Sequence, residues 1–123
     1  MVEQDIYTLL STTPAIEALV GTRIYPVELP TDAVLPAIVY TVISSVSNPT
    51  LDTAGMDKVR IEIESWGADA LTAISLRSTV RANIDGYFTP VLSITHCDTS
   101  TCFAQKEYQY KARSDYYVLT TQP

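Results

Sequence analysis

Residues 58–66 alternate strictly between charged and apolar side chains, and no other segment restricts the fold of this chain as tightly. The apolar set is Val59, Ile61 and Ile63, and the charged set is Lys58, Arg60, Glu62 and Glu64. Because a β-strand directs successive side chains to opposite faces, the segment predicts a strand with one face in the core and one charged face.

A second alternating segment lies near the C-terminal end of the sequence. One parity is mostly aromatic or small, and the other is mostly charged: Tyr108, Tyr110, Ala112, Ser114, Tyr116 and Val118 against Glu107, Gln109, Lys111, Arg113 and Asp115. This pattern predicts one long strand or two collinear ones. Opposite charges on the two alternating segments are typical of a solvated sheet face. They are also typical of a cross-strand ladder, in which the charged residues of 58–64 would pair with Lys111, Arg113 and Asp115.

Helical spacing predicts two helical regions. Residues 5–20 form a helix in two pieces, broken where Thr13 precedes Pro14 and ended by Gly21. Residues 68–85 carry apolar side chains three and four apart, with Leu71 widening the stripe. Further strands are expected at 37–46 and 88–97, after a proline-rich arm at 22–36. The expected fold class is α+β, an antiparallel sheet of about four strands with helices packed on one face.

The length of 123 residues predicts a single domain over 1–123, with a mobile loop at 47–57 and a loose tail at 120–123. A net charge of -6 argues against a nucleic-acid-binding surface and against docking on anionic membranes. No apolar run approaches the roughly 20 residues of a membrane-spanning helix. An acidic surface could still line a channel through which DNA slides without specific binding.

Catalytic and metal-binding patterns are weak. His96, Cys97 and Cys102 are fewer ligands than the four of a structural zinc site, although a Cys97–Cys102 disulfide is geometrically possible. Glu62 and Glu64 share a strand face as a glycosidase pair might, but Lys58 and Arg60 share it too, which favours a solvated or interface face. We therefore expect no catalytic residue, cofactor or metal, and a protein that is not an enzyme.

Several segments carry a family resemblance when they are taken in order. They are a helical segment ending at Val20-Gly21, Arg23-Ile24-Tyr25-Pro26, Leu35-Pro36-Ala37-Ile38-Val39-Tyr40, the strand ending at Trp66, the helix with Ala70, Leu76 and Val80, and Arg113-Ser114-Asp115-Tyr116. Together they resemble the tail completion, or tail terminator, proteins of long-tailed bacteriophages. The segment 98–105, which includes Cys102, has no counterpart in this resemblance.

The resemblance implies a structural protein of the virion tail or neck, assembled in the host cytoplasm. It implies a homo-oligomeric ring, usually of six subunits, that caps the tail tube protein, ends tube polymerisation and binds the head-side connector. DNA would pass through the ring, and no membrane is involved. The expected interface residues are Asp52, Met56, Lys58, Arg60, Glu62, Glu64, Lys111, Arg113 and Tyr117. Tyr117 is included because tyrosine is enriched at interfaces and this one lies on the charged parity.

Two rival hypotheses remain open at this point. One is another phage neck, connector or minor tail component of similar size. The other is a small α+β enzyme or ligand-binding domain, which would need a polar pocket around His96, the sole histidine.

Overall fold

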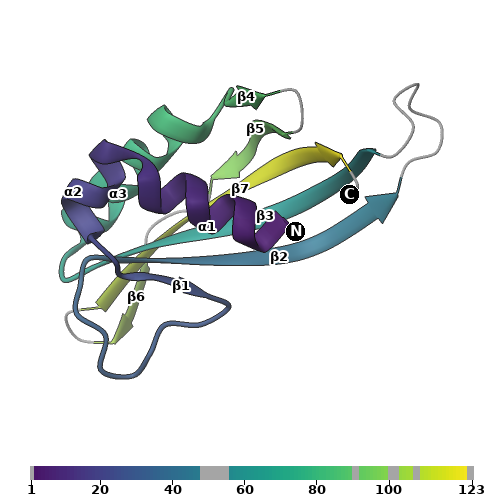
Figure 1. Cartoon of the computed structure of the whole chain (residues 1–123). Helices are drawn as coiled ribbons and strands as arrows, with labels where there is room; N and C mark the ends of the chain where they lie inside the picture. Colours follow the sequence, from purple (N-terminus) through teal and green to yellow (C-terminus); the bar gives the residue numbers. More distant parts are fainter. Residues whose placement is uncertain (1, 48–55, 90–91, 100–102, 107–108, 122–123) are drawn as a thin grey trace.

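The helices agree with the helical periodicity of the sequence. The computed structural model describes residues 2–47, 56–89, 92–99, 103–106 and 109–121 (Figure 1). Its helices within these ranges are α1 (Val2–Thr12), α2 (Pro14–Val20) and α3 (Ala70–Ile84). Thr13 occupies the N-cap of α2, as predicted, but its hydroxyl donates to the Leu9 carbonyl (2.6 Å) of α1 and makes no capping bond. The two helical pieces are thus joined by the residue that separates them.

The sheet is larger than the sequence predicts. In the described part of the chain it has seven strands, in the order β1-β2-β3-β7-β5-β4, with β6 also paired to β7. Their bounds are β1 (Ile24–Pro26), β2 (Ala37–Ser47), β3 (Met56–Gly67), β4 (Phe88–Thr89), β5 (Leu92–Thr99), β6 (Phe103–Lys106) and β7 (Gln109–Thr121). The expectation of about four antiparallel strands is therefore wrong in number. It is also wrong in sense at one edge, because β1 pairs with β2 in parallel.

The two alternating segments form the middle of the sheet. β3 pairs antiparallel with β7 over its whole length, with Ile61 opposite Tyr116 and Ile63 opposite Ser114. β2 flanks β3 on one side, and β5 flanks β7 on the other. The pairing also corrects two predicted boundaries. The expected 47–57 loop loses both ends to paired strands, since Ser47 pairs with Asp57. The expected 120–123 tail loses its first two residues to β7.

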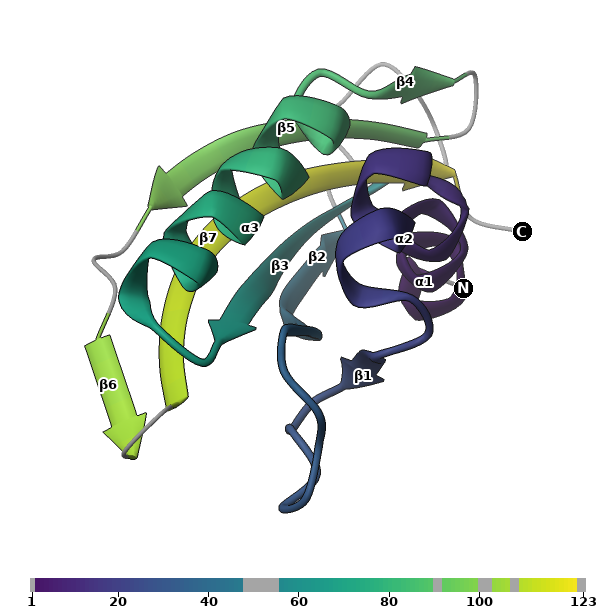
Figure 2. The ribbon, with the colours of Figure 1, turned by 90° about the vertical axis from the view of Figure 1, so that its left-hand side faces the viewer.

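The core lies between the sheet and the helices, which all cover one face, as the sequence predicts (Figure 2). The three helices and the strands β1, β2, β3, β5 and β7 contribute apolar side chains to it: Ile6, Leu10, Ile16, Val20, Ile24, Ile38, Tyr40, Val59, Ile61, Ile63, Leu76, Val80, Ile84, Leu92, Ile94, Tyr116 and Val118. Burial against this core raises the pKa of Tyr116 to about 12. Leu71, expected in the core stripe, is instead 77% exposed.

One part of β2 is covered on both faces. Ile38 and the neighbouring Val39 point to opposite faces, and both are fully buried, which confirms a prediction from the continuous apolar run. Further along the strand Ile43 is 49% exposed. Parallel pairing with the short β1 covers the outer edge of β2 only from Ile38 to Tyr40.

Candidate assembly interface

The open face of the sheet, opposite the helices, gathers most of the residues predicted for an interface. Because Val59, Ile61 and Ile63 point into the core, the intervening residues of β3 point to this open face. The register carries the same parity across to β7. The predicted residues brought together here are Lys58, Arg60, Glu62, Glu64, Lys111, Arg113 and Tyr117. Asp52 lies outside the described residues, and Met56 is described only as the first residue of β3.

Three ion pairs cross from β3 to β7 in a diagonal ladder. Arg60 Nη2 lies 2.7 Å from Asp115 Oδ2, Lys111 Nζ lies 3.1 Å from Glu64 Oε2, and Arg113 Nη1 lies 3.7 Å from Glu62 Oε2. In each pair the β7 residue is offset by two positions from the direct cross-strand partner. The sequence left a solvated face and a cross-strand ladder as alternatives, and the structure shows the ladder. The ladder also includes Asp115, which the interface prediction had left out.

The charged side chains of the ladder have little contact with solvent, although no helix covers this face. The ion-paired side chains are only 11–37% exposed. Burial raises the pKa of the Glu62 carboxyl; hydrogen bonding to Glu64, which only a protonated Glu62 can make, raises it further, while the Arg113 guanidinium lowers it. Asp115 Oδ1 and Trp66 Nε1 are buried, with no hydrogen-bond partner in the described structure. A protein surface laid over this face would therefore remove little further water from its charges.

Aromatic rings border the ladder at both ends. Lys58 Nζ lies 4.2 Å from the centre of the Tyr117 ring, and the Arg60 guanidinium lies 5.8 Å from it. At the other end Lys111 Nζ lies 5.6 Å from the Trp66 ring. These cation–π contacts hold long basic side chains against the sheet, so the open face is pre-ordered before any partner arrives.

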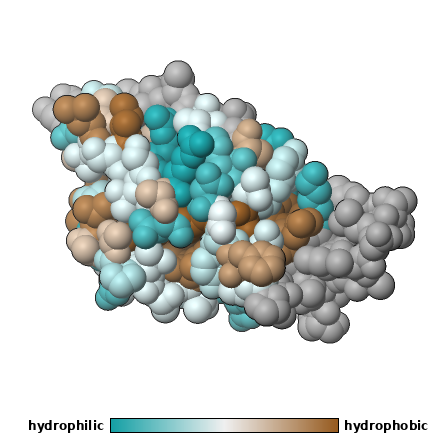
Figure 3. Space-filling view, turned by 90° about the horizontal axis from the view of Figure 1, so that it is seen from above, coloured by the Kyte–Doolittle hydropathy of each residue, from teal (hydrophilic) through white to brown (hydrophobic). Residues whose placement is uncertain are grey.

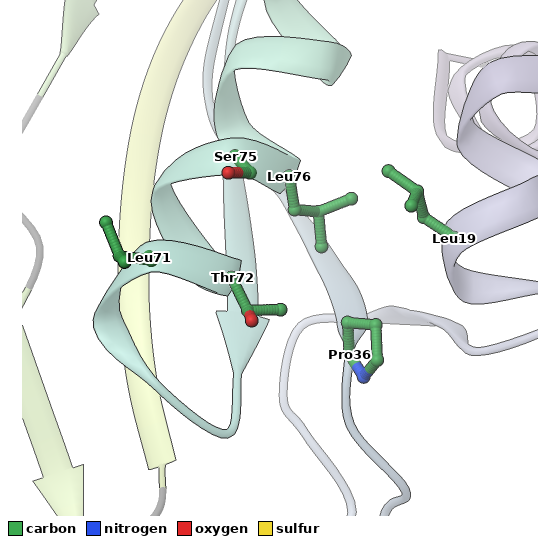
Figure 4. Close-up of a pocket in the computed structure, with 6 residues that line it drawn as sticks. All are labelled: Leu19, Pro36, Leu71, Thr72, Ser75 and Leu76. Carbon is green, nitrogen blue, oxygen red and sulfur yellow. The ribbon is translucent and has the colours of Figure 1, made fainter.

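The helix face carries an apolar groove that the sequence did not predict. It has a volume of about 290 Å³ and is lined by Leu19, Pro36, Leu71, Thr72, Ser75 and Leu76. Figure 4 shows Leu19 of α2 and Leu76 of α3 facing each other across the groove, with Pro36 at one end. Seen from above, hydrophobic side chains show in a band across the middle of the molecule (Figure 3). The exposed Leu71 was the one available signal, and helical spacing alone assigned it to the core.

His96 has a structural environment that accounts for it. Its backbone N–H donates to Asp85 Oδ1 (2.8 Å), and its ring meets the Tyr116 ring edge-on with the centres 5.4 Å apart. Its Nε2 lies 2.5 Å from the Thr99 hydroxyl. Cys97 is half-buried on β5, and Cys102, its possible disulfide partner, lies outside the described residues. Within the described ranges no three His, Cys, Asp or Glu side chains converge as a metal site would require.

Comparison with known proteins identifies the fold first. Eight chains of solved structures match this chain. One of them belongs to the structure titled "Virion of native gene transfer agent (GTA) particle". It superposes with a TM-score of 0.66 at 16% identity, over 94% of this chain and 91% of that chain. At this identity the likeness shows a shared fold.

The family follows from the sequence comparison. The profile of the family described as "Tail completion protein gp17" matches residues 4–120, nearly the whole chain. The chain therefore belongs to the gp17 tail completion protein family, a class of phage tail structural proteins. No curated protein matches it. Among the described helices, none is both long and apolar enough to cross a bilayer.

Proposed function

We propose that this protein assembles into a homo-oligomeric ring that caps the phage tail tube, ends tube polymerisation and joins the tail to the head-side connector. The observation that carries the proposal is the ion-pair ladder on the open sheet face, which is ordered, largely dehydrated and neutralised within one subunit. Membership of the tail completion family supports a role in the tail, and the likeness to a chain of a gene transfer agent virion supports a place within the virion.

A cap must accept one partner and refuse the next copy of it. A ladder neutralised by its own ion pairs suits this task, because a well-fitting partner can cover it without supplying a charge. A poorly fitting partner would exclude water from the ion pairs without replacing its hydrogen bonds, and would therefore bind weakly. Tyr117, beside Lys58 and Arg60, supplies a large amphipathic ring of the kind that dominates interface energetics. In this role the protein is not an enzyme and needs no cofactor.

Tube length tests the proposal. Purified tube protein is polymerised with and without this chain, and lengths are measured by electron microscopy. We expect shorter tubes bearing one cap each, and Tyr117→Ala should abolish capping while leaving the unfolding transition in place. Phe88→Ala, at an aromatic side chain 75% exposed on the outermost strand, is the matched control and should cap normally. Tubes of unchanged length with the wild-type chain would contradict the proposal.

The segment between β2 and β3 provides a second variant. We retain from the sequence the proposal that residues 47–57, including Asp52 and Met56, contact the tube. Replacing 48–55 by a short Gly-Ser turn should leave folding intact and abolish capping. If the wild-type chain binds purified connector and not tube ends, it is a neck component of another kind.

A further inference from the structure

A hollow on the helix side of the sheet combines carboxylates with tyrosine rings. It has a volume of about 550 Å³ and is lined by Glu3, Gln4, Asp5, Tyr7, Thr8 and Tyr40. Glu3 and Asp5 are exposed and make no ion pair with any described residue. The Tyr7 and Tyr40 rings are tilted against each other with their centres 6.4 Å apart. Carboxylates beside aromatic faces are the environment that an ammonium or guanidinium group prefers.

Tyr40 adds a polar hydroxyl group to the carboxylates that line this hollow. Its residue surface is only 8% exposed, yet its side chain lines the hollow and its hydroxyl has no hydrogen-bond partner among the described residues. Burial, then Tyr7, then Glu3 raise the pKa of Tyr40, so its hydroxyl stays protonated. The hydroxyl oxygen itself is not fully buried, so it meets solvent in the hollow and is open to a donor that enters from outside.

Lys58 is a base on the open sheet face that lacks an acid. Arg60, Lys111 and Arg113 are held in the ladder, and Arg81 Nε lies 3.7 Å from Asp85 Oδ2 on α3. Lys58 is exposed, and no side chain within the described structure offers it a carboxylate; its ammonium rests on the Tyr117 ring. It is therefore a pre-positioned cation with the charge that the hollow needs.

The sheet separates these two features. Tyr40 lies on the helix side, opposite Ile63, while Lys58 lies on the open side next to the inward-pointing Val59. The hollow and the cation of one copy thus cannot meet each other. Two complementary patches on opposite faces of one subunit produce a head-to-tail contact, which closes into a ring when the rotation permits.

We propose that the hollow formed by α1 and Tyr40 receives Lys58 of a second copy of this chain, and that this is a contact between ring subunits. Glu3 and Asp5 bind the ammonium group, and the Tyr40 hydroxyl accepts a hydrogen bond from it. The inference rests on the proposed function only in requiring that copies of the chain assemble.

Zero-length cross-linking tests the contact directly. A carbodiimide joins a lysine amine to a carboxylate that touches it. We expect a Lys58–Glu3 or Lys58–Asp5 cross-linked peptide in mixtures of ¹⁴N and ¹⁵N chains, with half of the cross-links carrying one label of each kind. Lys58→Arg keeps the charge, so it should assemble normally and lose the cross-link. The reaction is run on the purified chain and on the chain bound to tube ends. Absence of an intermolecular cross-link from both overturns the proposal.

Charge reversal gives a second, independent readout. Lys58→Glu and Asp5→Lys should each weaken self-association at least about tenfold in sedimentation experiments, and the double variant should recover much of the loss. Glu17→Lys, at an exposed acid of α2 outside the hollow, should associate as the wild type does. Wild-type association by Lys58→Glu, or a double variant no better than the singles, overturns the contact. A cross-linked assembly that fails to cap tubes would instead refute the proposed function alone.

Discussion

At the scale of single residues, the faces of β3 and β7 could be predicted but the ion pairs between them could not. Period two fixes which residues lie on the open face, and this prediction is confirmed for Arg60, Glu64 and Tyr117. The diagonal offset depends on the register of two strands far apart in the sequence and on the twist of the sheet. Neither is encoded locally. The groove around Leu19 and Leu71 could not be predicted either, because it depends on how α2 and α3 pack against each other.

The ladder predicts opposite responses to two isosteric substitutions. Asp115→Asn leaves the Arg60 guanidinium beside a neutral amide. It should lower the free energy of unfolding by about 2 kcal/mol. This is less than the cost of breaking a fully buried ion pair, because Arg60 is partly exposed. Glu62→Gln is the matched change on the next rung and should be neutral or slightly stabilising at neutral pH, because the raised pKa of Glu62 means that its ionised form is disfavoured in the folded protein. Urea unfolding of both variants measures the difference.

The raised pKa of Glu62 also predicts how the stability of the fold depends on pH. An acid whose folded-state pKa is raised binds a proton more readily in the folded state, so its contribution to stability grows as pH falls through that raised pKa and is complete below the ordinary value of 4.5. The wild-type chain should gain this contribution on mild acidification, and Glu62→Gln should lack it. Equal pH profiles for the two chains would refute this account of Glu62.

At the scale of elements, long periodic segments were predictable and short ones were not. α3, β3 and β7 each extend over eleven or more residues, with a clear period. The three-residue β1 contains Pro26, and its parallel pairing with β2 depends on tertiary packing that no local pattern records. The predicted 88–97 strand is divided into β4 and β5, which pair antiparallel with each other, Phe88 with Ser93 and Thr89 with Leu92. β6 lies in a segment for which no strand was predicted.

The turn from β3 into α3 gives a prediction of its own. A Cβ added at Gly67 would lie 2.7 Å from the Ala73 backbone nitrogen and 3.1 Å from the Asp69 carbonyl oxygen. Gly67→Ala should therefore cost about 3 kcal/mol, since neither backbone can move away. Gly86→Ala is the control: Gly86 has a φ of 81° but open space around it, so the cost should be about 1 kcal/mol. Thermal unfolding gives the order, and the reverse order would contradict the packing described here.

At the scale of the whole molecule, the two edges of the sheet differ in how well their backbone groups are protected from pairing with other strands. On the β5 edge the Ile94 N–H donates to the Tyr87 carbonyl (2.9 Å) and the His96 N–H donates to Asp85. On the β2 edge, backbone pairing by β1 ends at Tyr40, and residues 41–47 contain no charge, proline or glycine. An uncharged, β-branched edge of this length tends to pair with other strands.

The open edge predicts how the chain behaves in concentrated solution. Ile43→Lys places a charge on the β2 edge at a half-exposed position, so it should raise the solubility limit and suppress light scattering at little cost in stability. Thr95→Lys, at an exposed position on β5, is the control and should change neither. Faster aggregation of Ile43→Lys than of the wild type would contradict the assignment of this edge.

The position of β7 has a kinetic consequence. It lies between β3 and β5, although both precede it in the sequence. The sheet therefore cannot grow by adding neighbouring hairpins in turn: β3 and β5 must wait, each with an unpaired edge, until β7 inserts between them. Contacts as distant as Arg60 with Asp115 form only at that step, so folding should be slow for a chain of this size. Until that step is complete, the unpaired edges of β3 and β5 leave the chain most prone to misassembly with other copies.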